Sequence, residues 1–137
     1  MLYDQRYKCL CISRMKKRNY TWEEFDKDCD KIAKRLKKTK FHAIYGVPRG
    51  GLMVAVKLSH LLDIPITLDI YNANLVVDEI CDSGKTLLNL SKMPCIYKKR
   101  VFATIHIRDQ KRDKKPLFIP DIYLHKTKFW IVYPWEI

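Results

Sequence analysis

The sequence lacks the features that mark several classes of protein. Its 137 residues contain no apolar run near the roughly 18–20 residues that span a bilayer, which argues against a membrane-spanning helix. The first residues show no basic segment followed by an apolar stretch, so we expect no secretory signal. There is also no internal repeat and no low-complexity linker. We therefore expect a single domain over residues 1–137.

Cysteine is present but is not arranged for disulfides or for zinc. The five cysteines are an odd number without a Cys-x-x-Cys pair, and the four histidines lack metal-ligand spacing. This pattern excludes a disulfide-rich scaffold and predicts reduced thiols in a cytoplasmic protein. The cysteines are Cys9, Cys11, Cys29, Cys81 and Cys95.

Acidic residues are scarce beside basic ones. The chain has 27 Lys and Arg against 15 Asp and Glu, a net charge of +12. Such an excess indicates a polyanionic partner, either nucleic acid or a phosphate-rich small molecule. The net charge is +7 over residues 1–40, −1 over residues 41–95 and +6 over residues 96–137. The excess thus lies in two flanks around a nearly neutral middle, and charge alone does not choose the partner.

The apolar pattern predicts alternating strands and helices. Residues 21–38 predict a helix, because Thr21 and Glu24 form a capping box before apolar residues at helical spacing. Strands alternating with helices predict an α/β fold with an open, mainly parallel sheet flanked by helices. In such sheets ligands bind beyond the carboxyl ends of the strands. The further predictions are a strand at 41–47, a loop at 48–51, a helix at 52–62, strands at 66–70 and 75–78, a helix from about Thr86, and a strand at 101–107.

Residues 75–87, LVVDEICDSGKTL, carry the strongest local signal. An apolar strand leads into the adjacent carboxylates of Asp78 and Glu79, which can hold a diol or a hydrated magnesium ion. A third carboxylate, Asp82, precedes a Ser-Gly-x-Thr turn whose backbone N–H groups and hydroxyls can bind a phosphate. An ATP-binding P-loop would need glycine five residues before Gly84, where this chain has Glu79, so we exclude it.

This segment resembles the 13-residue signature for phosphoribosyl pyrophosphate (PRPP) of type I phosphoribosyltransferases. The resemblance implies that Asp78 and Glu79 bind the ribose hydroxyls and Mg²⁺, directly or through water. It implies that Asp82 is a general base or acid at purine N7. It further implies a 5′-phosphate site formed by Asp82, Ser83, Gly84, Lys85 and Thr86.

Residues 46–52, GVPRGGL, resemble the pyrophosphate-binding loop of the same family. A cationic arginine stands beside glycines that let backbone N–H groups approach a ligand. Alone, the segment is typical of a surface turn. With the signature downstream, it implies a pyrophosphate site formed by Pro48, Arg49, Gly50 and Gly51.

The C-terminal third is similar to the bacterial xanthine-guanine members of this family. The resemblance runs from about Tyr20 to the end, which implies a basic extension over residues 1–19 and a small C-terminal hood that binds the base. Arg108 stands where those proteins have a lysine for the exocyclic oxygen of the purine. By the same resemblance, Trp130 stacks on the base and Ile131 offers main-chain contacts at the purine 2-position.

The resemblance implies an enzyme that transfers the 5-phosphoribosyl group from PRPP to guanine, xanthine or hypoxanthine, with Mg²⁺ as cofactor. It also implies a homo-oligomer, a dimer or tetramer, and needs neither nucleic acid nor a membrane as partner. One feature departs from the family, whose long flexible loop closes over PRPP between the strands matching residues 66–70 and 75–78. Here only residues 71–74 lie between them.

Four residues are too few to fold over a ligand above the sheet. Either a neighbouring subunit or the basic N-terminal segment covers the site, or catalysis is weak. Two other functions therefore stay open. One is a relative that binds PRPP or nucleotides with weak or no turnover, and the other, motivated by the charge of +12, is a basic nucleic-acid-binding domain.

Overall fold

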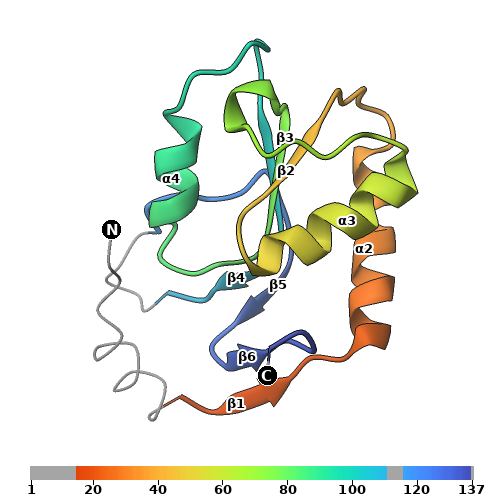
Figure 1. Cartoon of the computed structure of the whole chain (residues 1–137). Helices are drawn as coiled ribbons and strands as arrows, with labels where there is room; N and C mark the ends of the chain where they lie inside the picture. Colours follow the sequence, from red (N-terminus) through yellow and green to blue (C-terminus); the bar gives the residue numbers. More distant parts are fainter. Residues whose placement is uncertain (1–14, 111–115, 137) are drawn as a thin grey trace.

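Four strands form the main sheet of the computed structural model, which describes residues 15–110 and 116–136. Their order is β2-β3-β4-β5, and every neighbouring pair is parallel. Strands alternate with helices along the chain, which confirms the predicted α/β class (Figure 1). The elements are β1 (Lys17–Asn19), α2 (Trp22–Leu36), β2 (Ile44–Gly46), α3 (Gly50–Leu62), the 3₁₀ helix η1 (Ile70–Asn72), β3 (Leu75–Cys81), α4 (Lys85–Ser91), β4 (Val101–Arg108), β5 (Ile122–Thr127) and β6 (Trp130–Val132).

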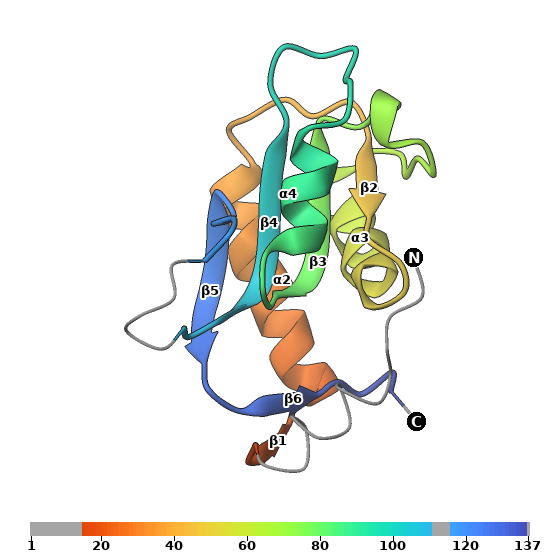
Figure 2. The same ribbon diagram turned by 90° about the vertical axis from the view of Figure 1, so that its left-hand side faces the viewer.

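Helices cover both faces of the main sheet (Figure 2). α2 and α3 pack on one face, in a core cluster that includes the fully buried Ile32, Leu58 and Leu75. α4 packs on the other face, where Leu87 joins a smaller cluster with Val76. Leu75 and Val76 are adjacent in β3, so the alternation of side chains along the strand supplies both cores.

The described cysteines, Cys29, Cys81 and Cys95, are free thiols. Cys9 and Cys11 lie outside the described residues.

In the part of the chain that the structure describes, no helix combines the length and the apolar character needed to cross a membrane.

Helix α2 begins where the sequence predicts it. The Thr21 Oγ1 accepts a hydrogen bond from the Glu24 N–H at 3.1 Å, and Glu24 Oε2 accepts one from the Thr21 N–H at 2.8 Å. This reciprocal pair confirms the capping box. The helix ends at Leu36, earlier than the predicted end at residue 38, and Lys37 is its C-cap.

Several predicted boundaries around the two ligand motifs are wrong. The predicted strand over residues 41–47 is shortened to Ile44–Gly46, and α3 begins at Gly50 rather than at Leu52. The strand predicted to end at Asp78 continues to Cys81, because its pairing with β4 extends that far. The acidic pair therefore lies within a strand, on the part that pairs with β4 and extends beyond β2.

The predicted strand over residues 66–70 is also wrong. Only Ile66 forms a bridge, to Ile44, and a 3₁₀ turn follows. The Asp69 carboxylate accepts a hydrogen bond from the Tyr71 N–H at 3.0 Å, which caps that turn and competes with strand pairing. The whole segment stays at the amino end of β2, since the Asn74 N–H donates to the Ala43 carbonyl at 3.3 Å.

A second sheet of two strands, the hood, lies beyond the carboxyl ends of the main strands (Figure 1). It pairs β1 with β6 in parallel, and Arg18 stands opposite Ile131. The C-terminal hood is thus completed by residues 17–19, which belong to the expected N-terminal extension. Residues 17–19 therefore form one of the two strands of the hood, in addition to contributing positive charge.

Arg100 ties the segment before β3 to the end of α4. Its guanidinium donates five hydrogen bonds of 2.8–3.2 Å to backbone carbonyls. The acceptors are the carbonyls of Ile70, Ala73, Leu90, Met93 and Pro94. A planar fork with five donors suits this cluster, and a lysine ammonium could not satisfy it.

We expect Arg100→Met to lower the free energy of unfolding by about 2–4 kcal/mol, because several carbonyls lose a charged donor. Urea unfolding measures this change. Lys99→Met removes the same charge from the adjacent residue and should cost less than about 0.5 kcal/mol. Equal effects of the two substitutions would show that the positive charge, rather than the five hydrogen bonds of the Arg100 guanidinium, stabilises the protein.

A buried polar network lies between α2, the main sheet and the hood. Tyr20 donates its hydroxyl proton to Asp28 at 2.5 Å, and His125 Nε2 lies 3.0 Å from the same carboxylate oxygen. His106 Nδ1 lies 2.9 Å from the Tyr133 hydroxyl. Burial, and secondarily the nearby His125, lowers the pKa of His106 to about 4. His106 is therefore neutral in the folded protein at pH 7.

This network predicts a dependence of stability on pH. The unfolded chain has a His106 pKa near its ordinary value of about 6.5, so it binds more protons than the folded chain as pH falls from about 6.5 to 4. Folding free energy should therefore be lost across this window, about 3 kcal/mol from His106 by pH 4. His106→Gln should flatten the slope in urea unfolding, whereas His60→Gln, at an exposed position, should leave it unchanged. Parallel slopes for all three proteins would contradict this assignment.

Candidate active site

The two ligand motifs meet at the carboxyl edge of β2 and β3. The Val47 N–H donates to the Val77 carbonyl at 2.9 Å, which places the loop after β2 against β3. A Cβ atom at Gly50 would lie 1.7 Å from Glu79 Oε2, and one at Gly51 would lie 2.8 Å from the Val77 carbonyl oxygen. A side chain at Gly51 would overlap the β3 backbone and one at Gly50 would displace the Glu79 carboxylate, so the glycine loop and the acidic pair form one unit.

The acidic pair is held in an unusual electrostatic state. Asp78 is buried, and burial together with the neighbouring Glu79 raises its pKa well above the ordinary range of a carboxyl group. Asp78 Oδ1 accepts a hydrogen bond from the Glu79 N–H at 2.9 Å. Two carboxylates so placed are stabilised by a cation or by hydroxyl donors brought by a ligand.

The donor set fits magnesium that is shared with a substrate. Carboxylate oxygens are hard ligands of the kind Mg²⁺ prefers. Among the described residues, no group of three or more His, Cys, Asp and Glu side chains can hold a metal ion by itself. Mg²⁺ is commonly held by one or two carboxylates together with substrate oxygens, and Asp78 and Glu79 meet that requirement.

The turn between β3 and α4 surrounds a hollow of about 90 Å³. Gly84 has φ +86°, and a Cβ there would lie 2.7 Å from the Phe118 nitrogen. Ser83 Oγ accepts a hydrogen bond from the Lys85 N–H at 3.2 Å, which closes the turn. The hollow is lined by Asp78, Ile80, Cys81, Asp82, Ser83, Gly84, Lys85, Thr86 and Leu87, so the predicted phosphate-binding residues are brought together.

Arg108 joins this turn to the hood. Its Nε lies 3.0 Å from Asp82 Oδ1, and its Nη1 donates to the Phe129 carbonyl. The Arg108 side chain is only 11% exposed, so this is a partly desolvated contact. The Gln110 side chain also donates to the Asp82 carbonyl, at 3.0 Å. The sequence predicts Asp82 and Arg108 as site residues but does not predict that they pair. It also does not predict Gln110, because no motif includes this residue.

The two hood residues predicted to contact the base lie on β6. The Trp130 N–H donates to Lys16 at 2.8 Å, and the Val132 carbonyl accepts from Tyr20 at 2.9 Å. Backbone groups of successive strand residues point to opposite sides, so the N–H and C=O of Ile131 point away from β1. The Ile131 side chain is buried, which leaves its main chain as the part that a ligand could reach.

Two predicted cations stand at the rim of the site. Arg49 and Lys85 are exposed and form no ion pair with any residue that the structure describes. The remaining loop residue, Pro48, is also exposed. The rim can therefore receive an anionic ligand without first breaking a salt bridge.

Known proteins are similar to this chain in sequence and in fold. No family model matches the sequence. The xanthine-guanine phosphoribosyltransferase of Cereibacter sphaeroides is 26% identical over 148 aligned positions, which cover 85% of each chain. The solved structure of the Helicobacter pylori xanthine-guanine-hypoxanthine phosphoribosyltransferase has a TM-score of 0.70 at 25% identity, and the match covers 88% of this chain and 94% of that chain.

A solved purine phosphoribosyltransferase from Pyrococcus horikoshii is 30% identical to this chain. The two structures superpose with a TM-score of 0.72 and cover 88% of this chain and 95% of that chain. The shared fold, the identity over nearly the full length and the PRPP signature at the edge of the sheet lead to one conclusion. This protein belongs to the type I phosphoribosyltransferase family.

Proposed function

We propose that the protein transfers the 5-phosphoribosyl group from PRPP to a 6-oxopurine, giving a nucleoside monophosphate and pyrophosphate. One observation carries the proposal: the glycine loop packs on Asp78 and Glu79 beside the turn that contains Asp82. The groups that would bind the pyrophosphate, the ribose and the 5′-phosphate of PRPP thus lie at one edge of the sheet. The names of the similar proteins, purine and xanthine-guanine phosphoribosyltransferases, support the same reaction.

PRPP binding uses each part of this edge. Asp78 and Glu79 accept hydrogen bonds from the ribose hydroxyls. The turn over residues 82–86 surrounds the 5′-phosphate with N–H groups, the hydroxyls of Ser83 and Thr86, and the Lys85 ammonium. The glycine loop, residues 48–51 with Arg49, binds the pyrophosphate group.

Asp78 and Glu79 are also the residues that would hold Mg²⁺. When bound there, Mg²⁺ supplies neutralising charge for the pyrophosphate leaving group. The raised pKa of Asp78, caused by burial and by Glu79, supports this placement, because added positive charge would stabilise the two neighbouring carboxylates.

The base is placed by the hood and by Arg108. Trp130 stacks on the purine, the Ile131 main chain faces its 2-position, and Arg108 donates to the exocyclic oxygen at position 6. The bond between ribose C1 and pyrophosphate breaks as a bond forms from purine N9 to C1. The N7 proton passes to the Asp82 carboxylate, which Arg108 holds in position at 3.0 Å.

A second function is favoured by one observation. The segment that replaces the family's flexible loop lies at the amino end of β2, through hydrogen bonds from Thr67 to Ile44 and from Asn74 to Ala43. It cannot reach a ligand at the carboxyl edge, so it cannot exclude water there. The alternative is therefore a PRPP-binding or nucleotide-binding relative with weak or no turnover.

We also propose that the protein is cytoplasmic and consists of a single domain. The free thiols of Cys29, Cys81 and Cys95 suit the reducing cytoplasm. A single domain, with its family-like core over residues 20–137 and β1 (Lys17–Asn19) completing the hood, accounts for the shared sheet and the hood. Its ligands are PRPP and a purine base.

The test is pyrophosphate release from PRPP and Mg²⁺ with guanine, xanthine or hypoxanthine. We expect turnover with at least one base, and Asp82→Asn should lower kcat by about 10²–10⁴-fold because it removes the proton acceptor. PRPP affinity, measured by calorimetry, should change little. Asp109→Asn, a matched change outside the phosphate turn, should keep full turnover. PRPP binding without turnover of any base would instead support the alternative function.

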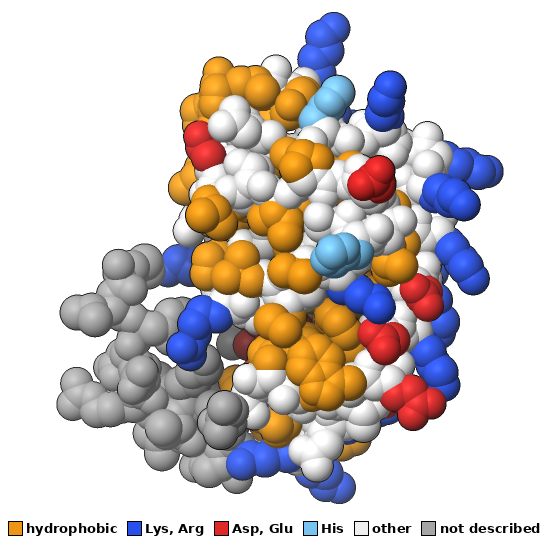
Figure 3. Space-filling view, turned by 45° about the vertical axis from the view of Figure 1, so that its right-hand side comes forward, with side chains coloured by type: hydrophobic (Ala, Val, Ile, Leu, Met, Phe, Trp, Pro, Cys, Tyr) orange, Lys and Arg blue, Asp and Glu red, His pale blue; other side chains and the backbone are white. Residues whose placement is uncertain are grey.

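We also propose that the protein is a homo-oligomer that associates through the outer face of α3. The exposed surface of α3 carries apolar side chains on both of its flanks, Val56 (47% exposed) and Leu61 (41%), and the following segment exposes Leu68 (84%). Figure 3 shows apolar side chains gathered on this side of the molecule. A helix that is apolar also on its outer face normally packs against a partner.

Sedimentation velocity tests this association. We expect the wild-type protein to sediment as a dimer or tetramer and Val56→Lys to shift it toward the monomer, because a charge would be buried in the interface. Ile119→Lys places the same charge at another exposed apolar position and should leave the oligomer intact. A monomeric wild type, or equal effects of both substitutions, would refute the assigned face.

A further inference from the structure

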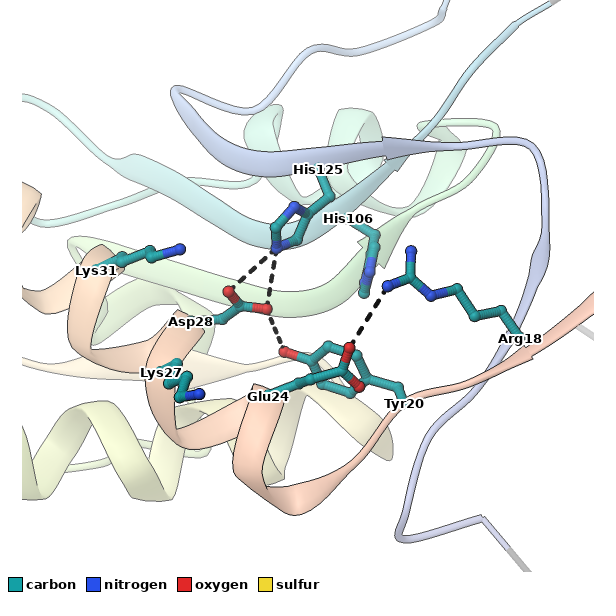
Figure 4. A pocket seen from close by; sticks show the side chains of 8 residues that line it. All are labelled: Arg18, Tyr20, Glu24, Lys27, Asp28, Lys31, His106 and His125. Atoms are coloured by element: carbon teal, nitrogen blue, oxygen red, sulfur yellow. Dashed lines mark hydrogen bonds and ion pairs between the residues drawn. The ribbon is translucent and has the colours of Figure 1, made fainter.

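A second cleft lies on the side of the sheet that α2 covers, apart from the candidate active site. Its volume is about 220 Å³, and its walls come from β1, α2, β4 and β5. It shares no residue with the glycine loop, the acidic pair or the phosphate turn. Figure 4 shows its lining residues, which are Arg18, Tyr20, Glu24, Lys27, Asp28, Lys31, His106 and His125.

The base of the cleft presents a hydrogen-bond acceptor. The Tyr133 hydroxyl donates its one proton to the Glu79 carbonyl at 3.3 Å, so its oxygen accepts from His106 Nδ1–H at 2.9 Å. Since the pKa of His106 is lowered to about 4, the ring is neutral at pH 7 and its Nε2 carries a lone pair. The residue is 4% exposed, and Nε2 has no hydrogen-bond partner among the described residues. A ligand in the cleft would have to bring a donor to this atom.

The mouth of the cleft presents positive charge. Lys31 is exposed and forms no ion pair within the described residues. Lys27 pairs at 3.4 Å with the exposed Glu23, and Arg18 pairs at 3.5 Å with Glu24. Exposed pairs of this kind are weak, so all three cations can turn to an anionic ligand.

The carboxylates that line the cleft are already engaged. Asp28 accepts from the Tyr20 hydroxyl at 2.5 Å and lies 3.0 Å from His125 Nε2. Glu24 accepts the Thr21 N–H at 2.8 Å in the capping box of α2. They therefore balance their own partners, and what the cleft leaves open is one acceptor at its base and three cations at its mouth.

We propose that this cleft is a second ligand site, which takes a small organic phosphate. A hydroxyl or N–H group of the ligand donates to His106 Nε2 at the base, and the phosphate contacts Lys31 and Lys27 at the mouth. A doubly charged phosphate matches several cations better than a single carboxylate does. A bare anion without a proton would place oxygen lone pairs against the lone pair of His106 Nε2, so it should bind poorly.

The test is a titration of the full chain with ribose 5-phosphate at pH 7.5, followed by NMR of the histidine imidazoles. The four histidines are His42, His60, His106 and His125, so each resonance can be assigned by substitution. We expect saturable shifts at His106 and His125 and none at His42 and His60. Sulfate, which has charge but no proton to donate, should bind at least about tenfold more weakly, the effect of one charge-assisted hydrogen bond.

Matched lysine substitutions locate the phosphate. Lys31→Gln should weaken ribose 5-phosphate binding about tenfold, whereas Lys38→Gln, in the turn that follows the same helix and outside the cleft, should not change it. Both lysines are exposed, so neither variant should disturb folding. Unchanged His106 and His125 signals at 10 mM (roughly the weakest useful affinity), equal binding of sulfate, or equal effects of both substitutions would each overturn the proposal.

Discussion

The contact between the glycine loop and the acidic pair is the constraint on which the candidate site depends. Gly50 and Gly51 lie so close to Glu79 and Val77 that any side chain there would overlap with them. This contact buries Asp78 beside a second carboxylate, an arrangement that costs free energy in the absence of a ligand. Such a cost is typical of a site built to receive positive charge and hydroxyl donors, and it explains why two separate segments of the sequence function as one.

The hood also contacts the carboxyl edge of the main sheet. Arg108 ends β4 and connects Asp82, in the turn between β3 and α4, to the carbonyl of Phe129 just before β6. The Tyr133 hydroxyl reaches the Glu79 carbonyl from the hood as well. Side chains therefore join the hood to β3 and to the turn that follows it.

The net charge of +12 has a more specific meaning once the fold is known. Few of the basic residues lie in the candidate active site, where Arg49, Lys85 and Arg108 are the cations. Others line the second cleft on α2, where Lys31 is unpaired among the described residues. A small part of the positive charge thus lies in two separate regions, the candidate active site and the second cleft.

The sequence by itself determined the α/β class, the capping box of α2 and the two ligand motifs, because these rest on local periodicity, local hydrogen bonds and short spacings. Only the tertiary structure decided that residues 66–70 form no strand, since pairing with β2 stops at the Ile66–Ile44 bridge and the Asp69 side chain caps a 3₁₀ turn beyond it. It also decided the pairing of Asp82 with Arg108, the strand β1 in the hood and the cleft around His106. These features join residues far apart in the chain, and no local pattern encodes contacts that form only when the sheet brings such residues together.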